Sequence, residues 1–212
     1  VDVIYPCTAK HIAKHEAQKT AMIRESPAIY RAAVVPYINA IPAAHIQWVF
    51  NIIDGKSEME RVILQDCDAE TGFTLLPDLK WDQAQVEQLY CVAIVRRRDV
   101  KSIRDLTSEH LPLLKNVLER SYVEIKNKFG VERSSLKAYL HYHPSYYHLH
   151  VHFTHTRLGS VGNGAGKAHL LADIIANIET FGSDFYQKAT LEVEVGTGQE
   201  LFKRLTAEAG SA

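Results

Sequence analysis

Three histidines, His148, His150 and His152, alternate with apolar residues in the second half of the chain. Side chains on a β-strand point to opposite faces in turn, so a strand here would place three imidazoles on one face and its apolar residues in the core. A row of imidazoles loses solvation on burial, and its members repel one another when they are protonated. This costly pattern therefore indicates a functional site.

Three interpretations of the histidine row remain open from the residues alone. A polar strand face that is rich in histidine by chance is the simplest, although histidine is uncommon and the alternation is regular. A metal site is the second, because His-x-His on a strand suits zinc, but no Cys, Asp or Glu follows nearby as a base or further ligand. The third is attack on phosphorus by a neutral imidazole nitrogen, with groups such as Ser145 neutralising the phosphate oxygens.

The composition limits the class of protein. The 212 residues are 46% hydrophobic, which is enough apolar material for a core. Charged residues make up 23% and the formal net charge is −1, so any nucleotide contact must be local. No stretch of about 18 apolar residues exists, so no membrane-spanning helix is expected. Cys7, Cys67 and Cys91 have no short-range pairing, which indicates a reduced, intracellular protein.

Strands and helices must position these histidines, and the apolar spacing predicts both. The expected strands cover residues 30–38, 45–53, 61–65, 73–76, 90–95, 136–142, 148–154 and 190–195. The expected helices cover residues 8–24, 82–89, 107–128 and 168–178, with a further short helix at the C-terminal end. Antiparallel strands with helices between them are typical of the α+β class.

Longer segments around the histidines carry a family resemblance. The stretch HLHVHFT resembles the His-x-His-x-His signature of the histidine-triad superfamily. Four segments are similar, in matching order, to the scavenger mRNA-decapping enzymes within that superfamily. They are IQWVFNIIDGKSE, GFTLLPDLKW, IRDLTSEHLPLL and HYHPSYYHLHVHFTH. The resemblance runs from about Val3 to the C-terminal helix. It implies a histidine-triad type of α+β fold, in which an antiparallel β-sheet is flanked by α-helices.

The resemblance also implies an activity, namely hydrolysis of the 5′-5′ triphosphate bridge of N7-methylguanosine cap dinucleotides or short capped RNA during mRNA decay. His150 would be the nucleophile, would form a phosphohistidine and would release N7-methyl-GMP without a metal or a cofactor. His141, His148 and His152 would bind and orient phosphate oxygens. The family implies a homodimer in the cytoplasm and nucleus, with no membrane partner. A general histidine-triad nucleotide hydrolase and a cap-binding module that does not cleave remain alternatives.

The same resemblance implies residues that bind the cap. Trp48 would stack on the methylated base, whose positive charge is attracted to an indole face, and Leu79 would cover the other face of the base. Glu58 would accept the N1–H and N2–H donors of guanine. Further implied contacts, mostly to the phosphate chain, are Asp78, Lys80, Tyr90, Ser145, Tyr146 and Lys167. On composition alone, Trp48 would be an ordinary core residue and Glu58 an ordinary surface residue.

The chain departs from the family pattern in several places. Lys167 stands where an Arg is expected, which keeps the charge but loses the bidentate geometry. His143 and His155 are additional histidines whose roles the sequence leaves open. The glycine-rich loop over 159–166 lacks the lysine and serine of a phosphate-binding loop, so we expect a flexible connection. We also expect that the family's N-terminal domain is absent.

The expected domain organisation follows from that absence. Residues 1–28 should form a hinge and N-terminal helical segment, and residues 29–212 the histidine-triad catalytic domain.

Overall fold

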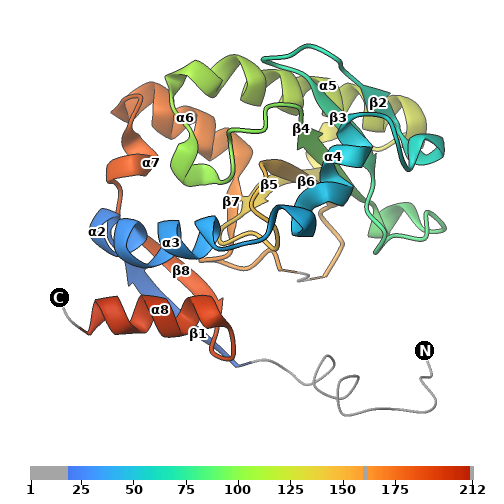
Figure 1. Ribbon diagram of the computed structural model, residues 1–212. Helices are drawn as coiled ribbons and strands as arrows, with labels where there is room; N and C mark the ends of the chain where they lie inside the picture. Colours follow the sequence, from blue (N-terminus) through green and yellow to red (C-terminus); the bar gives the residue numbers. More distant parts are fainter. Residues whose placement is uncertain (1–18, 160–161, 211–212) are drawn as a thin grey trace.

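The computed structural model describes residues 19–159 and 162–210, and its central element is a six-stranded antiparallel sheet (Figure 1). The strands lie in the order β2-β3-β4-β6-β5-β7. They are β2 (Leu64–Gln65), β3 (Phe73–Pro77), β4 (Tyr90–Val95), β5 (Leu136–His141), β6 (His150–His155) and β7 (Ala168–Leu170). A separate antiparallel pair is formed by β1 (Thr20–Glu25) and β8 (Leu191–Gly196). The α+β class is confirmed, and the arrangement is consistent with a histidine-triad type of fold.

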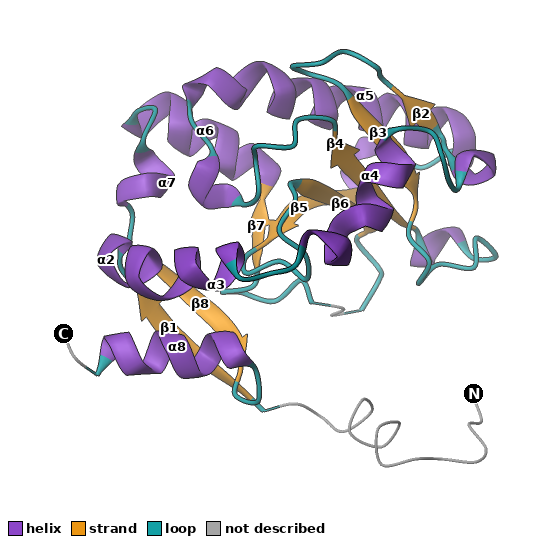
Figure 2. Ribbon diagram, viewed as in Figure 1, coloured by secondary structure: helices purple, strands orange, loops and turns teal. Residues whose placement is uncertain are grey.

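Helices lie on both faces of the sheet (Figure 2). They are α2 (Pro27–Ile29), α3 (Val35–Asn39), α4 (Gln47–Ile53), α5 (Leu111–Phe129), α6 (Leu171–Phe181), α7 (Phe185–Lys188) and α8 (Glu200–Ala209). Helices α5 and α6 cover one face, α4 covers the other, and α8 lies beside the β1–β8 pair. None of the helices within the described residues is long and apolar enough to cross a membrane.

Neighbouring residues of the central strands pack on opposite faces of the sheet. In β4, Ala93 and Val95 belong to the large core that contains the buried residues of α5 and α6. Val92 and Ile94, which alternate with them, form a second cluster with the buried residues of α4. The period of two along β4 therefore separates a thick core from a thinner layer beneath α4.

His150 and His152 of β6 lie on the α4 face of the sheet. His150 is opposite Ile94 and His152 is opposite Val92 in the antiparallel register. Val151, which lies between the two histidines in sequence, belongs to the large core on the other face. The predicted alternation of imidazoles and core residues is therefore confirmed for His150 and His152, whereas His148 lies before the strand begins.

Several other predicted elements are confirmed with small shifts at their ends. The expected strands over 73–76, 90–95, 136–142, 148–154 and 190–195 correspond to β3, β4, β5, β6 and β8. The expected helix over 107–128 corresponds to a 3-10 turn, Ser108–His110, followed by α5. This helix has a proline in its first turn and ends at Gly130, whose φ of 70° favours glycine. The expected C-terminal helix corresponds to α8.

Two predicted strands, over 30–38 and 45–53, are wrong because both segments are helical. The first is α2, a π-helical turn (Tyr30–Val34) and α3, and the second is a 3-10 turn (Ala43–Ile46) followed by α4. In α4 the buried residues Val49, Ile52 and Ile53 recur at helical spacing, although β-branched and aromatic residues favour strands. Their burial against β3 and β4 overrides the local preference.

Other expectations were wrong in part. The helix expected over 8–24 lies mostly outside the described residues, and its last residues belong to strand β1, which pairs with β8 along its whole length. Of the strand expected over 61–65, only Leu64–Gln65 forms, and of the helix expected over 82–89, only a 3-10 turn at Val86–Gln88 forms. The first three residues of the helix expected over 168–178 form β7 instead, because they pair with β5. The division of the chain at residue 28 stays a prediction.

Candidate active site

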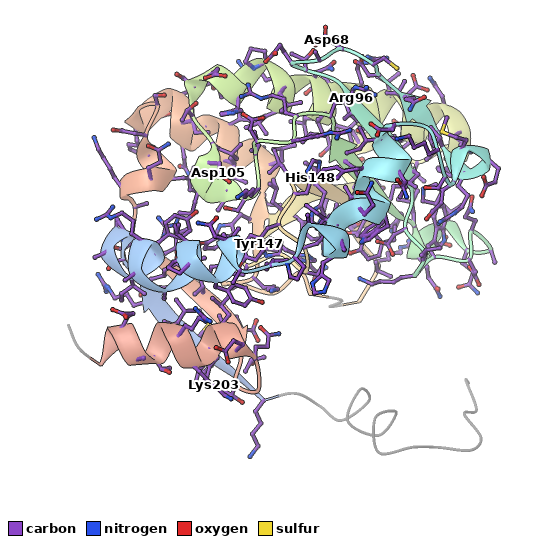
Figure 3. All side chains as sticks on the ribbon, viewed as in Figure 1. Asp68, Arg96, Asp105, Tyr147, His148 and Lys203 are labelled. Carbon is purple, nitrogen blue, oxygen red and sulfur yellow. The ribbon has the colours of Figure 1, made fainter. Side chains whose placement is uncertain are left out.

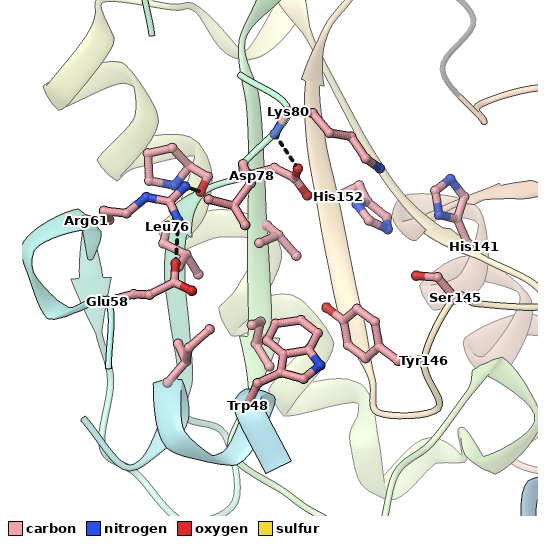
Figure 4. A pocket seen from close by; sticks show the side chains of 15 residues that line it. Trp48, Glu58, Arg61, Leu76, Asp78, Lys80, His141, Ser145, Tyr146 and His152 are labelled. Atoms are coloured by element: carbon pink, nitrogen blue, oxygen red, sulfur yellow. Dashed lines mark hydrogen bonds and ion pairs between the residues drawn. The ribbon is translucent and has the colours of Figure 1, made fainter. Parts of the chain in front are cut away.

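One cavity lies between helix α4, the loop after β3 and the connection from β5 to β6 (Figure 4). It gathers side chains from segments that are far apart in the sequence. Most of the predicted site residues line it: Trp48, Glu58, Asp78, Leu79, Lys80, His141, Ser145, Tyr146 and His152. Four other predicted residues, Tyr90, His148, His150 and Lys167, are not part of this lining.

Helix α4 places Trp48 at one end of the cavity. The helix buries Val49, Ile52 and Ile53 against the sheet, so Trp48 lies on its exposed side. The indole meets the ring of Tyr146 edge-on, with the ring centroids 5.0 Å apart. An exposed indole beside a cavity can stack on a planar ligand and attracts a cationic ring.

Glu58 lies at the same end and is held by an ion pair. Its backbone is in the left-handed region, at φ 57°. Its Oε2 is paired with Nη1 of Arg61, and Nη2 of Arg61 donates to the backbone carbonyl of Pro77 over 2.6 Å. A partly shielded carboxylate of this kind can accept a pair of N–H donors from a ligand.

The loop after β3 forms the adjoining wall. Oδ1 of Asp78 accepts the backbone N–H of Lys80 over 2.9 Å, and Trp81 is buried with its Nε1–H donated to a backbone carbonyl. The anchored loop leaves Leu79 exposed and holds Nζ of Lys80 5.2 Å from the ring centroid of Tyr90. The loop therefore presents an exposed apolar side chain, Leu79, next to a positively charged one, Lys80.

Two backbone carbonyls fix the hydrogen positions on His148 and His150. Nε2 of His148 lies 2.8 Å from the carbonyl of Val95, and Nδ1 of His150 lies 2.7 Å from the carbonyl of His148. A carbonyl only accepts, so each of these nitrogens carries a hydrogen. Burial lowers the pKa of His150 to about 3. Its imidazole is therefore neutral, with an unprotonated Nε2 that can act as a nucleophile.

Burial also keeps His141 and His152 neutral. It lowers the pKa of His141 to about 4, with the charge of Lys167 as a smaller cause, and it lowers the pKa of His152 well below the ordinary value. The two rings lie with their centroids 4.3 Å apart. Nδ1 of His152 lies 3.0 Å from the hydroxyl of Tyr90, which orients the ring. Two oriented, neutral imidazoles at the cavity surface can bind phosphate oxygens.

Tyr146 covers His150. The two rings are stacked, with their centroids 4.0 Å apart and an interplanar angle of 14°. His150 is buried, and the phenol ring that stacks on it also meets the indole of Trp48 edge-on. Tyr146 therefore contacts both the exposed indole and the candidate nucleophile.

Tyr90, an implied contact of the phosphate chain, and Lys167, an implied substrate contact whose role the sequence leaves open, both lie outside the lining of the main cavity. Tyr90 is buried and reaches the cavity through the hydroxyl contact to the imidazole described above. Nζ of Lys167 donates to the backbone carbonyl of His143 over 2.5 Å. Lys167 lines a neighbouring cavity, which shares Lys80, His141 and Ser145 with the first. Lys167 therefore lies near the candidate phosphate end without lining the main cavity.

A buried cluster anchors the connection from β5 to β6 and accounts for His143, whose role the sequence left open. Nε2 of His143 lies 2.8 Å from Oε2 of Glu25, and its Nδ1 lies 3.0 Å from the hydroxyl of Tyr147. Nη2 of Arg104 and the hydroxyl of Tyr142 donate to the other oxygen of Glu25, over 2.6 and 2.7 Å. All of these side chains are buried. Figure 3 labels one of them, Tyr147. The cluster ties the cavity wall to strand β1.

His155, the other additional histidine, has a local role. It ends β6, and its Nδ1 accepts the backbone N–H of Arg157 over 3.0 Å. This bond supports the turn after the strand, away from the cavity lining.

The site contains residues that the sequence analysis missed. Arg61 holds Glu58, while Ile52, Val92 and Ile94 form an apolar floor. The spacing of Glu58 and Arg61, three residues apart, was the available signal, but we expected a strand to begin at Arg61. The apolar floor could not be located before the register of β4 against β6 was known.

The cavity combines two kinds of contact. The aromatic ring, the carboxylate and the exposed leucine at one end suit a planar base with N–H donors. The lysine, the serine hydroxyl and the neutral imidazoles at the other end suit phosphate oxygens. Across residues 19–159 and 162–210, no group of three or more His, Cys, Asp or Glu side chains is placed to hold a metal ion. The arrangement fits a nucleotide with its base at α4 and its phosphates toward β6.

Comparison with known proteins gives an independent result. A family profile described as "Scavenger mRNA decapping enzyme C-term binding" matches residues 47–167. The matched range contains the predicted site residues from Trp48 to Lys167.

Curated relatives match almost the whole chain. A protein named m7GpppX diphosphatase from Ascaris suum is 44% identical over 202 residues, which are 95% of this chain and 66% of the relative. The protein of the same name from Homo sapiens is 43% identical over 203 residues, 96% of this chain and 60% of the relative. That from Schizosaccharomyces pombe is 38% identical over 206 residues and 67% of its length. The chain thus spans less than two thirds of the Ascaris and human relatives.

Proposed function

The chain belongs to the family of scavenger mRNA decapping enzymes, and we propose that it hydrolyses the 5′-5′ triphosphate bridge of N7-methylguanosine caps. The substrates would be cap dinucleotides and short capped oligoribonucleotides, and one product would be N7-methyl-GMP. The observation that carries this proposal is the single cavity that has Trp48 and Glu58 at one end and His141 and His152 at the other. The names of the relatives agree with it.

In the proposed complex, the methylated base stacks on Trp48, and Leu79 covers its second face. The positive charge that N7-methylation places on guanine strengthens the contact with the indole by about 0.5–2 kcal/mol. Glu58 accepts the N1–H and N2–H donors of guanine, which adenine does not present in this arrangement. This end of the cavity thus selects the cap base.

The proposed chemistry begins at Nε2 of His150, which attacks the phosphorus next to methylguanosine. The bond from this phosphorus to the bridging oxygen breaks, and the diphosphate portion leaves with that oxygen. Water then attacks the same phosphorus and the P–N bond breaks. This step yields N7-methyl-GMP, restores the neutral imidazole and releases one proton to solvent. The carbonyl of His148, 2.7 Å from Nδ1, stabilises the charge on the phosphorylated ring.

Neighbouring groups bind the phosphate oxygens in this mechanism. When the Tyr90 hydroxyl donates to Nδ1 of His152, Nε2 of that ring carries the hydrogen and donates to the substrate. His141, Ser145 and Lys80 add further donors or charge at the cavity surface. His148 acts through its backbone carbonyl and its fixed ring. The ring of Tyr146 stacks on the face of the His150 imidazole, while the lone pair of Nε2 lies in the plane of that ring.

The biological setting belongs to the same proposal. By analogy with the family, the protein would act as a homodimer in the cytoplasm and nucleus and would clear cap fragments left by mRNA decay. No metal and no cofactor take part in the proposed reaction.

Product analysis and competition binding test the proposal. Cap dinucleotide incubated with the protein under single-turnover conditions should give N7-methyl-GMP and GDP, identified by liquid chromatography. N7-methyl-GDP should bind at least about tenfold more tightly than GDP, because only the methylated base is cationic. Equal binding of the two nucleotides would favour a general histidine-triad hydrolase, and tight binding without turnover would favour a cap-binding module. Either result would contradict the proposed function.

A further inference from the structure

We infer that Arg61 is a positioning residue for base selection, which holds the Glu58 carboxylate at a fixed distance from the loop that carries Leu79. This inference rests on the proposed function, in which Glu58 binds the guanine edge. It concerns a side chain that lines the cavity at the base end and has no direct part in the chemistry at the histidines.

The backbone of Glu58 requires external support. Its φ of 57° lies in the left-handed region, which residues with a Cβ rarely adopt. It precedes a single 3-10 turn, Met59–Arg61, in which the backbone N–H of Arg61 donates to the carbonyl of Glu58 over 3.0 Å. Such a short turn does not by itself fix the side chain of the residue before it. The Arg61 guanidinium supplies that restraint through Nη1 and Oε2 of Glu58.

The second nitrogen of the same guanidinium reaches the adjoining wall, where strand β3 ends. Nη2 of Arg61 donates to the backbone carbonyl of Pro77 over 2.6 Å. Pro77 ends β3, and Leu79 follows two residues later. A planar guanidinium presents its donors in a rigid fork, so one side chain sets the distance between the carboxylate and the loop. A lysine has the charge but not this geometry.

The exposure of this ion pair distinguishes it from ordinary surface pairs of the protein. The side chains of Arg61 and Glu58 are 20% and 31% exposed, whereas those of Arg133 and Glu119, an ion pair on the outer surface, are 57% and 59% exposed. Shielding from water strengthens a charged hydrogen bond and makes its geometry matter more. Arg133 therefore offers a matched control for Arg61.

The arrangement leaves the carboxylate able to bind a base. Arg61 occupies one lone pair of Oε2, and a carboxylate has about four such sites. Within the described part of the chain, Oε1 has no hydrogen-bond partner and lies toward the cavity (Figure 4). A guanine edge can therefore approach Glu58 with both donors while Arg61 stays in place. Without Arg61, the carboxylate would rotate, and the gap between it and the Leu79 loop would no longer match a flat base.

The test compares two probes that differ by one amino group, N7-methyl-GDP and N7-methyl-IDP. Both should stack on Trp48, but only the first offers the N2–H donor to Glu58. Isothermal titration calorimetry gives the ratio of their affinities for wild type, Arg61→Met, Arg61→Lys and the control Arg133→Met. We expect Arg61→Met to reduce the wild-type preference for N7-methyl-GDP at least about tenfold, the lower end of the scale of one charged hydrogen bond. Arg61→Lys should lose part of the preference, and Arg133→Met should keep it.

The outcomes separate positioning from a structural role. Positioning predicts that Arg61→Met weakens N7-methyl-GDP binding more than N7-methyl-IDP binding, because only the first loses two hydrogen bonds, while kcat on saturating cap dinucleotide stays within about threefold of wild type. An unchanged affinity ratio in Arg61→Met, or in Arg61→Lys if the first variant does not fold, would overturn the role of Arg61 alone. A wild-type protein that binds both probes equally would overturn the proposed binding of guanine by Glu58, and this inference with it.

Discussion

The histidine row and the base end of the cavity differ in how deeply their side chains are buried. His148, His150 and His152 are 1%, 3% and 5% exposed, whereas Trp48 is 45% exposed and Leu79 is 81% exposed. Burial at the histidine end fixes the protonation state of the imidazoles before any ligand arrives. The base end keeps apolar surface that a bound base would cover. Binding the base therefore requires side chains that are open to solvent, whereas keeping the imidazoles neutral requires side chains that are buried.

The two ends also depend on different parts of the fold. The histidine end lies on β4 and β6, at the centre of the sheet, where ladder hydrogen bonds and both core clusters restrain the backbone. The base end is built from α4, a short turn and the loop after β3. Changes at the histidine end should therefore affect catalysis and pH response, and changes at the base end should affect affinity.

Loss of the buried imidazole has the largest expected effect. His150→Asn removes the Nε2 lone pair, so single-turnover cleavage of cap dinucleotide should fall by at least about 10⁴-fold. The affinity for N7-methyl-GDP should change by less than about threefold, because the base contacts lie at the other end. Quench-flow measures the first quantity and calorimetry the second. A large loss of affinity in this variant would show that the two ends are not separate.

Loss of the exposed indole should have a smaller effect, on the affinity for the base and not on the rate of cleavage. Trp48→Ala removes the stacking surface, and the Kd for N7-methyl-GDP should rise about 10- to 100-fold. The kcat at saturating substrate should stay within about threefold, since no atom of Trp48 takes part in the bond changes. Steady-state kinetics with cap dinucleotide give both values. A variant with unchanged Kd and a reduced kcat would reverse the assignment of the two ends.

The pH dependence of the free energy of unfolding should show that the buried histidines are neutral in the free protein. The pKa of His150 is about 3 and that of His141 about 4 in the folded state, against about 6.5 for an unfolded chain. Between pH 6.5 and about 4, the unfolded state therefore binds protons that the folded state does not, and the free energy of unfolding falls as the pH falls.

His150→Asn should make this slope shallower by up to about 1.4 kcal/mol per pH unit, the limit for one proton. Urea unfolding followed by circular dichroism between pH 5 and 6.5, above the main range of carboxylate titration, measures the slope. The Trp48→Ala variant should keep the wild-type slope, which makes it the matched control. Equal slopes for wild type and His150→Asn would contradict a buried, neutral His150.

Chelation should have the smallest effect. The proposed reaction uses no metal, so incubation with EDTA followed by gel filtration should leave kcat for cap dinucleotide unchanged within error. Activity is measured before and after zinc is added back. Strong inhibition that zinc reverses would favour the metal site that the histidine row also allows.

The sequence predicted the histidine end well, for a physical reason. Alternation along one strand needs no knowledge of other segments, because the strand itself directs neighbouring side chains to opposite faces. His150 and His152 therefore lie on the face that the sequence indicates. The base end was reached only through the family resemblance, since Trp48 lies on a helix in a segment that we expected to be a strand. Tertiary burial of one helical stripe decided its conformation.

Contacts between distant segments could not be predicted from the sequence at all. The stacking of Tyr146 on His150 depends on how the chain turns before β6. The contact between His143 and Glu25 joins residues more than 100 positions apart, and no pattern in either segment indicates the other. Arg61 lies close to Glu58 in sequence, but its second contact, with the carbonyl of Pro77, depends on the tertiary position of β3.

The central claim is that His150 attacks the phosphorus next to methylguanosine, and trapping the covalent intermediate tests it most directly. Cap dinucleotide labelled with ³²P at that phosphorus would be mixed with excess protein and quenched in base, which preserves phosphohistidine. The account predicts label on wild-type protein, located at His150 by peptide mapping and absent from His150→Asn. Label on another residue, or cleavage by wild type with no labelled protein at any time, would contradict it.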